Sequence, residues 1–478
     1  MSNTNKNRLR SFLSPFAAII ISAAITVGQE SEISEQAHTL SLEEFINQSV
    51  INDTVFEEIL INELTLQYTK TLGLPAADIL LDIKGSYRFN TDQDIEDPEG
   101  SISLTKLFPR FGTDLSATYA ASVTSADTAD SEMEFTISQP IAKNAFGRTY
   151  RLDEAIIGIE NEIASFQIVE AYEDYLASII KIYYNWYEAY TSMQTAESSY
   201  RENLKLLKNI EERRTNNIAL RVDVNKITLQ VLAKKEDLIA LTNQYHEELN
   251  LVKEAIRYQG YEAIKPVNPT LYRSVTIDFD GDFQKFFEQS RTARILNLIE
   301  SKTNHEVDKY ANNLFPSLNL LFTHQIDGDD YDVNSPEKEY HAGIEIELPV
   351  PSSVERAQYR TALIENRKSV LNRANTYSRL STQLRNLYEN IQTEKQLISI
   401  AEEKLMLGEE ILEDETENYS YGRVTLNDLI QEINKHDQNR FNKILSELRY
   451  KTLVLEWQRL TDQLITRDKI KTPIKPLP

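Results

Sequence analysis

The 478-residue chain contains no cysteine and has a formal net charge of −23, because acidic residues far outnumber basic ones. The lack of cysteine excludes disulfide bonds, thiolate metal sites and an N-terminal lipidated cysteine. The deficit of positive charge argues against nucleic acid as a partner, since a phosphate-binding surface needs concentrated Lys and Arg. This composition is compatible with an envelope protein whose helices mostly face water.

Catalytic and metal-binding motifs are also missing. The six histidines are scattered and do not form the H-E-x-x-H spacing of a zinc site. There is no phosphate-cradling glycine loop, no nucleophile elbow and no dinucleotide-binding glycine fingerprint. The acidic segment 327–332 lacks the ligand order of an EF-hand. We therefore expect no enzymatic activity, with no catalytic residue, no metal and no cofactor.

A long uncharged run occurs only near the N-terminus. Lys6, Arg8 and Arg10 precede it, and the run covers residues 11–28. This arrangement predicts a secretory signal peptide at 1–28, with an uncleaved membrane anchor as the alternative. No later run is apolar enough for a membrane-spanning helix, so any membrane insertion must use β-strands.

The chain contains an internal duplication. Landmarks of the first half recur in the second at an offset of 241, namely Phe45, Gln48, Ser49 and Pro75 as Phe286, Gln289, Ser290 and Pro316. At the next landmark, Pro140 and Pro349, the offset is 209. The first copy therefore carries an insertion about one β-hairpin long, near residues 101–123.

Six segments alternate apolar and polar residues, which predicts β-strands with one apolar and one polar face. Their apolar members are Leu81, Ile83, Tyr87 and Phe89; Ile102 and Leu104; Leu115, Ala117, Tyr119, Ala121 and Val123; Met133, Phe135 and Ile137; Leu318, Leu320 and Phe322; and Tyr340, Ala342, Ile344, Ile346 and Leu348. A soluble sheet packed on a core is one interpretation. A membrane β-barrel is the other, because the segments between the strands, 92–100, 126–131 and 327–339, are polar and acidic.

After each strand region comes a helix too long for a globular core. Apolar positions between Ile168 and Ile210, and again between Tyr377 and Leu412, are spaced by four and three residues. This heptad pattern predicts coiled-coil packing. The first helix, from about 153 to 214, would be ~90 Å long at ~1.5 Å per residue. A filamentous coiled-coil scaffold would explain these helices but not the strands.

The two helix-to-helix turns match each other at an offset of 205, which pairs Asn217 with Gly422 and Asp223 with Asp428. A tight reversal needs a residue in the left-handed backbone region, which Gly adopts freely and Asn tolerates. Each aspartate begins a return helix, where a carboxylate is favoured by the helix dipole. Helix capping alone is therefore a sufficient role for both aspartates.

The turn Y-S-x-G with Asp six residues after the Gly, the matching turn of the first copy, Gln139-Pro140 with Leu348-Pro349, and the duplication resemble the TolC-like outer-membrane efflux proteins. The resemblance covers about residues 40–464. It implies a mixed α and β membrane protein that forms a homotrimer. Strands from three chains would close an outer-membrane β-barrel, and the long helices would continue it as a hollow periplasmic α-helical barrel.

On this basis we divide the chain into nine segments. They are a signal peptide (1–28), the N-terminal helix of copy 1 (29–75), the barrel strands of copy 1 with the extra hairpin (76–140), the coiled-coil hairpin of copy 1 (141–258), a linker or equatorial segment (259–282), the first helix of copy 2 (283–315), the barrel strands of copy 2 (316–349), the coiled-coil hairpin of copy 2 (350–466) and a loose tail (467–478). The extra hairpin would either add strands to the barrel or form an extracellular extension.

The resemblance also implies an acidic constriction at the periplasmic entrance. Asp428 matches one aspartate of that ring, and the second would fall on Gln431, so the ring is less acidic than in the family pattern. Asp223 and Tyr419 match positions that latch neighbouring coiled coils in the closed state. The usual basic latch partner would fall on Val424, beside Arg423. The adaptor-docking tip would comprise Asn217, Ile218, Gly422 and Arg423.

These assignments imply a passive exit duct in the outer membrane of a Gram-negative-type cell, with a large periplasmic part. Its partners would be two further copies of itself, outer-membrane lipid, a periplasmic adaptor protein and an inner-membrane pump of the RND or ABC class. The alternative is a coiled-coil envelope scaffold or adhesin with a β-anchor that conducts nothing.

Overall fold

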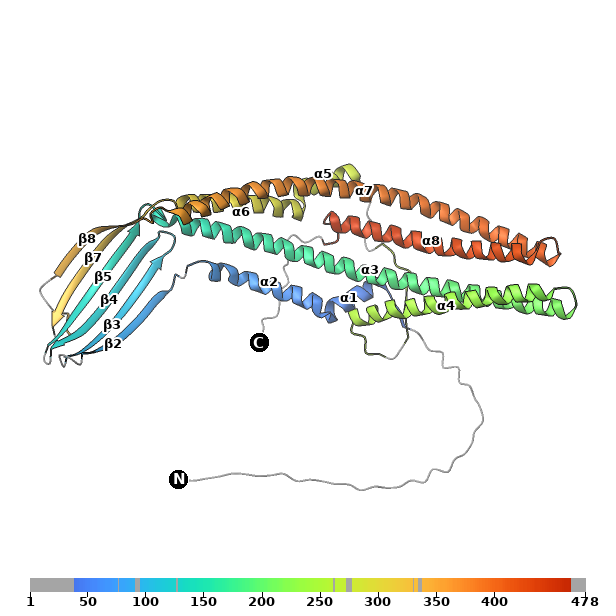
Figure 1. Cartoon of the computed structure of the whole chain (residues 1–478), viewed down its shortest axis with the longest axis horizontal. Helices are drawn as coiled ribbons and strands as arrows, with labels where there is room; N and C mark the ends of the chain where they lie inside the picture. Colours follow the sequence, from blue (N-terminus) through green and yellow to red (C-terminus); the bar gives the residue numbers. More distant parts are fainter. Residues whose placement is uncertain are drawn as a thin grey trace, which may run out of the picture.

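The computed structural model describes residues 38–75, 77–90, 95–125, 128–260, 263–271, 277–329, 331–333 and 338–465. The predicted signal peptide (1–28) and the tail (467–478) lie outside the described residues. A curved β-sheet forms one end of an elongated molecule, and long helices run from it to the other end (Figure 1). No helix in the described part of the chain is both long enough and apolar enough to span a membrane.

The helices occur in the same order in both halves of the chain, which confirms the predicted duplication. The first copy contains α1 (Leu42–Asn52), α2 (Thr54–Gly73), the 3₁₀ turn η1 (Ala145–Gly147), α3 (Arg148–Thr215) and α4 (Arg221–Ala255). The second contains α5 (Phe279–Gln289), α6 (Arg291–Asn312), α7 (Ser353–Ser420) and α8 (Leu426–Leu460). The two longest helices, α3 and α7, have 68 residues each, which corresponds to ~100 Å.

The N-terminal helical region of each copy differs from the sequence prediction, because each predicted single helix (29–75 and 283–315) is a pair of helices. Asp53 accepts a hydrogen bond from the backbone N–H of Val55 at 2.9 Å, and the Ser290 hydroxyl accepts one from the N–H of Ala293 at 3.1 Å. Each side chain caps a new helix and leaves its own backbone extended, so the chain changes direction. In addition, α5 begins at Phe279, inside the predicted linker.

All six predicted strands form one antiparallel sheet. They are β2 (Ile79–Asn90), β3 (Ile95–Phe108), β4 (Thr113–Ser125), β5 (Thr128–Pro140), β7 (Ser317–Asp329) and β8 (Lys338–Glu347), adjacent in that order. The extra hairpin is β3 and β4, so the insertion lies within the sheet and not outside it. Its bounds are wider than the predicted 101–123.

The strands are longer than predicted, at the expense of the acidic loops. β3 begins inside the predicted loop 92–100, β5 begins inside 126–131, and β7 extends into 327–339. Backbone pairing continues past the last apolar residue of each strand, because polar side chains at a strand end do not stop the hydrogen-bond ladder.

The sheet has one apolar and one polar face across all six strands. Paired residues on one face form a row through the strands, Leu81, Leu104, Ala117, Phe135, His324 and Tyr340. Side chains of the apolar face are exposed, with Ile83 at 67% and Ile344 at 65%. In the part of the chain that the structure describes, the helices extend away from the sheet and leave this face uncovered (Figure 1).

The helical core is built on α3, which packs along α2, α4, α6 and α8. The predicted heptad seam is buried here, with Ile179, Trp186 and Ala189 at 3% exposure or less. A short parallel ribbon, β1 (His38–Leu40) with β6 (Ile264–Pro266), crosses this core and was not predicted. The Tyr183 hydroxyl holds the ribbon to α3, because it donates to the carbonyl of Leu40 at 2.7 Å and accepts from the N–H of Val267 at 3.0 Å.

A buried charge cluster joins the two copies near the middle of the rod. The Arg291 guanidinium, at the start of α6, pairs with Glu173 of α3 and with Asp462, which follows α8, at 3.0 Å. The N–H of Ile465 donates to Glu173 at 2.9 Å. Burial raises the pKa of Glu173 to about 7, although the positive charge of Arg291 opposes this shift. Three separate segments, namely α3, α6 and the residues that follow α8, therefore meet in this cluster.

We predict that Arg291→Met lowers the free energy of unfolding by about 3–5 kcal/mol at pH 8, because it leaves buried carboxylates without a counter-charge. At pH 5 the loss should be smaller, since a Glu173 with its pKa raised above the unfolded value is then a neutral acid. The control is Arg201→Met, which breaks the exposed pair with Glu197 and should cost about 0.5 kcal/mol or less. Denaturation with guanidinium chloride in detergent at both pH values measures the free energy of unfolding of each variant. Equal losses for Arg291→Met and Arg201→Met would contradict the role assigned to Arg291.

Candidate functional site at the helical tip

The two helix-to-helix turns lie at the end of the rod opposite the sheet (Figure 1). An apolar cluster holds the two helical hairpins together just above the turns, where Leu426 of α8 packs with Ile210 of α3 and with Val224 and Ile227 of α4. Large apolar side chains nevertheless remain exposed on the turns themselves, namely Ile218, Leu220, Val222 and Tyr421. The tip therefore has a rigid base and an apolar outer surface.

The backbone geometry of both turns agrees with the sequence prediction. Asn217 has φ 59° and Gly422 has φ 74°, both in the left-handed region. The N–H of the next residue reaches back to the end of the helix in each case, from Ile218 to the carbonyl of Arg213 at 2.8 Å and from Arg423 to that of Asn418 at 2.9 Å. A Cβ at Gly422 would meet no atom within 4 Å, so backbone strain alone limits substitution there.

Both aspartates cap the return helices. Asp223 accepts a hydrogen bond from the N–H of Leu220 at 3.1 Å. Asp428 accepts from the N–H of Thr425 at 3.0 Å and from its hydroxyl at 2.7 Å, while the same hydroxyl accepts from the N–H of Asp428. Leu220 has no side-chain acceptor, so only the second turn has the reciprocal bonds of a full capping box.

The charge of Asp428 is stable over a wide pH range, because the hydrogen bonds from Thr425 hold the pKa of its carboxyl below the usual 3.8. Gln431 lies three residues later on α8, on the same side of the helix. Both side chains are exposed in the single chain. They can therefore face a common axis in an assembly without disturbing the fold.

The predicted latch residue Tyr419 is in contact with a residue of the other hairpin that the sequence reasoning missed. The guanidinium of Arg213, at the end of α3, lies 5.0 Å from the centre of the Tyr419 ring at the end of α7. Burial, and to a lesser degree the nearby Asp223 carboxylate, raises the pKa of Tyr419, while Arg213 opposes this shift. The sequence feature that could have identified Arg213 is its place in the last turn of α3, where basic residues are favoured.

Arg423 does not reach the other hairpin within the chain. Its guanidinium lies 5.0 Å from the Tyr421 ring and 3.5 Å from the side-chain oxygen of Asn418, both in its own turn. Its side chain is exposed. A latch between Arg423 and a neighbouring chain stays a prediction.

A second polar contact between the hairpins lies higher on the rod and was also missed. Asp437 of α8 is 3% exposed, accepts from the Lys234 ammonium of α4 at 2.7 Å, and accepts from the Ser199 hydroxyl of α3 at 2.5 Å. The contact lies ~24 Å from the tip, which is the rise of α3 from residue 199 to its end at 215. Asn203 is a polar residue within the apolar spacing between Ile168 and Ile210, and this interruption was the only feature of the sequence that pointed to the contact. Its side-chain amide donates to the backbone carbonyl of Ser199 at 2.8 Å.

No protein-family model matches the sequence, and a sequence comparison with curated proteins gives no significant match. Solved structures do match in fold. The channel-forming protein CusC aligns with 91% of this chain and 96% of its own, at a TM-score of 0.67 and 13% identity. The outer-membrane protein VceC of Vibrio cholerae aligns with 88% of this chain and 95% of its own, at a TM-score of 0.68 and 12% identity.

The open state of the MtrE outer-membrane channel of Neisseria gonorrhoeae aligns with 90% of this chain and 91% of its own, at a TM-score of 0.67 and 13% identity. Each of these alignments spans about nine-tenths of this chain and nine-tenths or more of the matched chain. The chain therefore has the fold of the TolC-like outer-membrane channels, as the duplication and the two matched turns predicted.

Proposed function

We propose that this protein is a passive exit duct of the outer membrane, with a large periplasmic part, and that it works in a tripartite efflux or type I secretion system. The observation that supports this most is the uncovered apolar face of a sheet whose other face is polar. Such a sheet is suited to lipid on one side and a water-filled passage on the other. The long helices then continue the passage through the periplasm.

The duct is a homotrimer in this proposal. One chain supplies a sheet with two unpaired edges, and the seams of its two coiled-coil hairpins cover only part of each helix surface. Copies related by a threefold axis would place Asp428 and Gln431 around the narrow end. Tyr419, Asp223 and Arg423 would then latch neighbouring coiled coils in the closed state.

The exposed apolar surface of the tip supports docking of a periplasmic adaptor protein, which would couple the duct to an inner-membrane pump of the RND or ABC class. Ile218 is 65% exposed and Tyr421 is 64% exposed, and both are held on rigid left-handed turns. Opening would separate the hairpins at the tip, and no covalent step is required.

Single-channel conductance of the purified protein in planar bilayers tests the proposal. Discrete conductance steps with cation preference are expected. A β-anchored scaffold or adhesin, the alternative function, would be inserted into the membrane but would give no steps. The lack of conductance steps would refute the proposed duct function but would leave the membrane assignment unchanged.

Substitutions on the sheet test the membrane assignment. Ile344→Arg on the apolar face should destabilise the assembled protein by about 2–4 kcal/mol if it lies near mid-bilayer, and Tyr87→Arg, nearer the outer end, by less. Glu345→Arg and Ser86→Arg, their neighbours on the polar face, should be tolerated. Folding into lipid vesicles, followed by urea titration, measures these effects, and equal tolerance on both faces would refute lipid contact.

The docking role predicts that Gly422→Val abolishes export while the amount of assembled protein stays normal. A β-branched residue opposes the left-handed backbone, at a cost of about 1–2 kcal/mol or more. Gly422→Asn is the matched control, because Asn217 already holds the same conformation in the first turn. Export and adaptor cross-linking in cells measure the outcome, and full export by Gly422→Val would exclude this turn from docking.

The gate role predicts that Asp428→Asn reduces cation selectivity. Three like charges around a narrow axis attract cations, and screening is incomplete only where the passage is narrow. Asn can still accept the hydrogen bond from the N–H of Thr425, so the turn should fold normally. Reversal potentials at low salt test this point, and an unchanged value in Asp428→Asn would leave only the capping role.

A further inference from the structure

The two copies contribute unequally to the sheet. The second copy supplies β7 and β8, whereas the first supplies β2 to β5, because β3 and β4 are inserted between the strands that correspond to the second copy's pair. The inserted strands are paired along most of their length with β2, with each other and with β5. They therefore cannot be removed from the sheet without opening ladders on both sides.

The inserted strands have the same two faces as the other four. On the apolar face, Ile102 and Leu104 of β3 are each 46% exposed and lie opposite Tyr119 and Ala117 of β4. On the polar face the Ser103 and Thr118 hydroxyls are 3.2 Å apart. A folded extension outside the membrane would have no reason to leave one continuous apolar face in register with its neighbours.

The turn between the inserted strands is fixed to the start of the helical rod. Arg151 of α3 donates to the carbonyl of Arg110 at 3.1 Å, and the Gln139 amide donates to the carbonyl of Phe111 at 3.0 Å. Gly147 lies so close beneath that a Cβ there would be 2.4 Å from the Arg110 carbonyl oxygen. The hairpin therefore spans the sheet fully, from its outer end to the rod.

The sheet ends in two open edges, β2 and β8. Five successive antiparallel pairings connect β2 to β8, so these two edge strands run in opposite directions. β8 of one copy can consequently pair with β2 of the next in the same antiparallel pattern, and a closed barrel has no exposed edge. The partner that fits both edges is a second copy of this chain.

We propose, on the basis of the trimeric duct above, that three sheets of six strands close into one barrel of 18 strands. In each chain, β3 and β4 are two full strands of the barrel wall. Two strands per copy of the duplication would have given 12. Because barrel diameter grows roughly linearly with strand number, the insertion widens the membrane passage about 1.5-fold. The narrow point of the duct is then the helical tip and not the membrane section.

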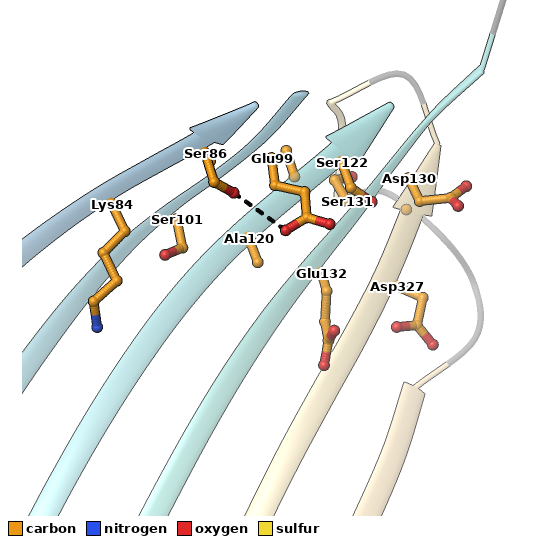
Figure 2. Close-up of a pocket in the computed structure, with 13 residues that line it drawn as sticks. Lys84, Ser86, Glu99, Ser101, Ala120, Ser122, Asp130, Ser131, Glu132 and Asp327 are labelled. Carbon is orange, nitrogen blue, oxygen red and sulfur yellow. Dashed lines mark hydrogen bonds between the residues drawn. The ribbon is translucent and has the colours of Figure 1, made fainter. Parts of the chain in front are cut away.

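The insertion also sets the chemistry of the wall. A hollow of ≈840 Å³ lies on the polar face. Among its lining residues, Ser86 of β2 donates to the Glu99 carboxylate of β3 at 3.3 Å (Figure 2). Further carboxylates come from β5 and β7, at Glu132 and Asp327 (Figure 2). Deeper in the barrel, the inserted strands contribute uncharged hydroxyls, namely Ser103, Thr105, Ser116 and Thr118. The wall would therefore be acidic towards the outer end of the barrel and rich in hydroxyls on the inserted strands nearer the rod.

The absence of native cysteine allows a direct test with single-cysteine variants and a membrane-impermeant maleimide on intact outer membranes. Ser103→Cys and Ser116→Cys should be labelled through the lumen, whereas Leu104→Cys and Ala117→Cys should be protected by lipid. The reference pair on β8 is Glu345→Cys, which should be labelled, and Ile344→Cys, which should not.

Labelling at all four inserted positions with normal alternation on β8 would overturn the 18-stranded barrel and leave the duct intact. Loss of alternation on β8 as well would refute the proposed membrane function itself. Electron cryo-microscopy of the detergent-solubilised wild-type protein provides a second measurement. A cross-section with 18 strands is expected, and 12 strands with the hairpin outside would also overturn the proposal.

Discussion

The apolar side of the sheet must be covered, and no helix in the described part of this chain covers it. Burial of apolar surface is the main driving force of folding, yet side chains such as Ile83 and Ile344 are about two-thirds exposed in the single chain. An edge-open sheet with such a face is also prone to aggregation. Lipid on the apolar face and further copies at β2 and β8 remove both problems, so this one constraint leads to the proposed membrane location and to oligomerisation.

The helical rod follows a different rule, since its surface is mostly polar and its stability comes from a narrow seam. α3 is the shared element, with α4 beside it from the same copy and α6 and α8 from the other. Buried polar contacts fix the register of this packing, with Arg291 near the middle of the rod and Asp437 nearer the tip. Removing one partner of such a contact leaves a buried charge, so these contacts disfavour arrangements of the helices in which the partners are separated.

The tip combines rigid turns with a changeable junction. The left-handed residues Asn217 and Gly422 and the caps at Asp223 and Asp428 hold each hairpin end in one shape. The junction between hairpins combines the buried apolar cluster around Ile210 and Leu426 with weaker contacts nearer the turns, such as the stacking of Arg213 on Tyr419. Separation of the hairpins would therefore break these weaker contacts first, while the buried Asp437 cluster above would remain to guide the movement.

The sequence by itself determined the local features of this protein, because these depend on neighbours in the chain. Period-two and heptad patterns predicted the six strands and the long helices, and the turn chemistry predicted the conformations of Asn217 and Gly422. Only the tertiary structure decided where the hairpin of β3 and β4 lies, since alternation shows two faces but not which strands pair. Only the tertiary structure revealed the contacts of Arg213, Lys234 and Asp437 and the cluster around Arg291. The partners in these contacts are more than one hundred residues apart in the chain. Their contacts are set by how α3, α6 and α8 pack, which no local pattern records.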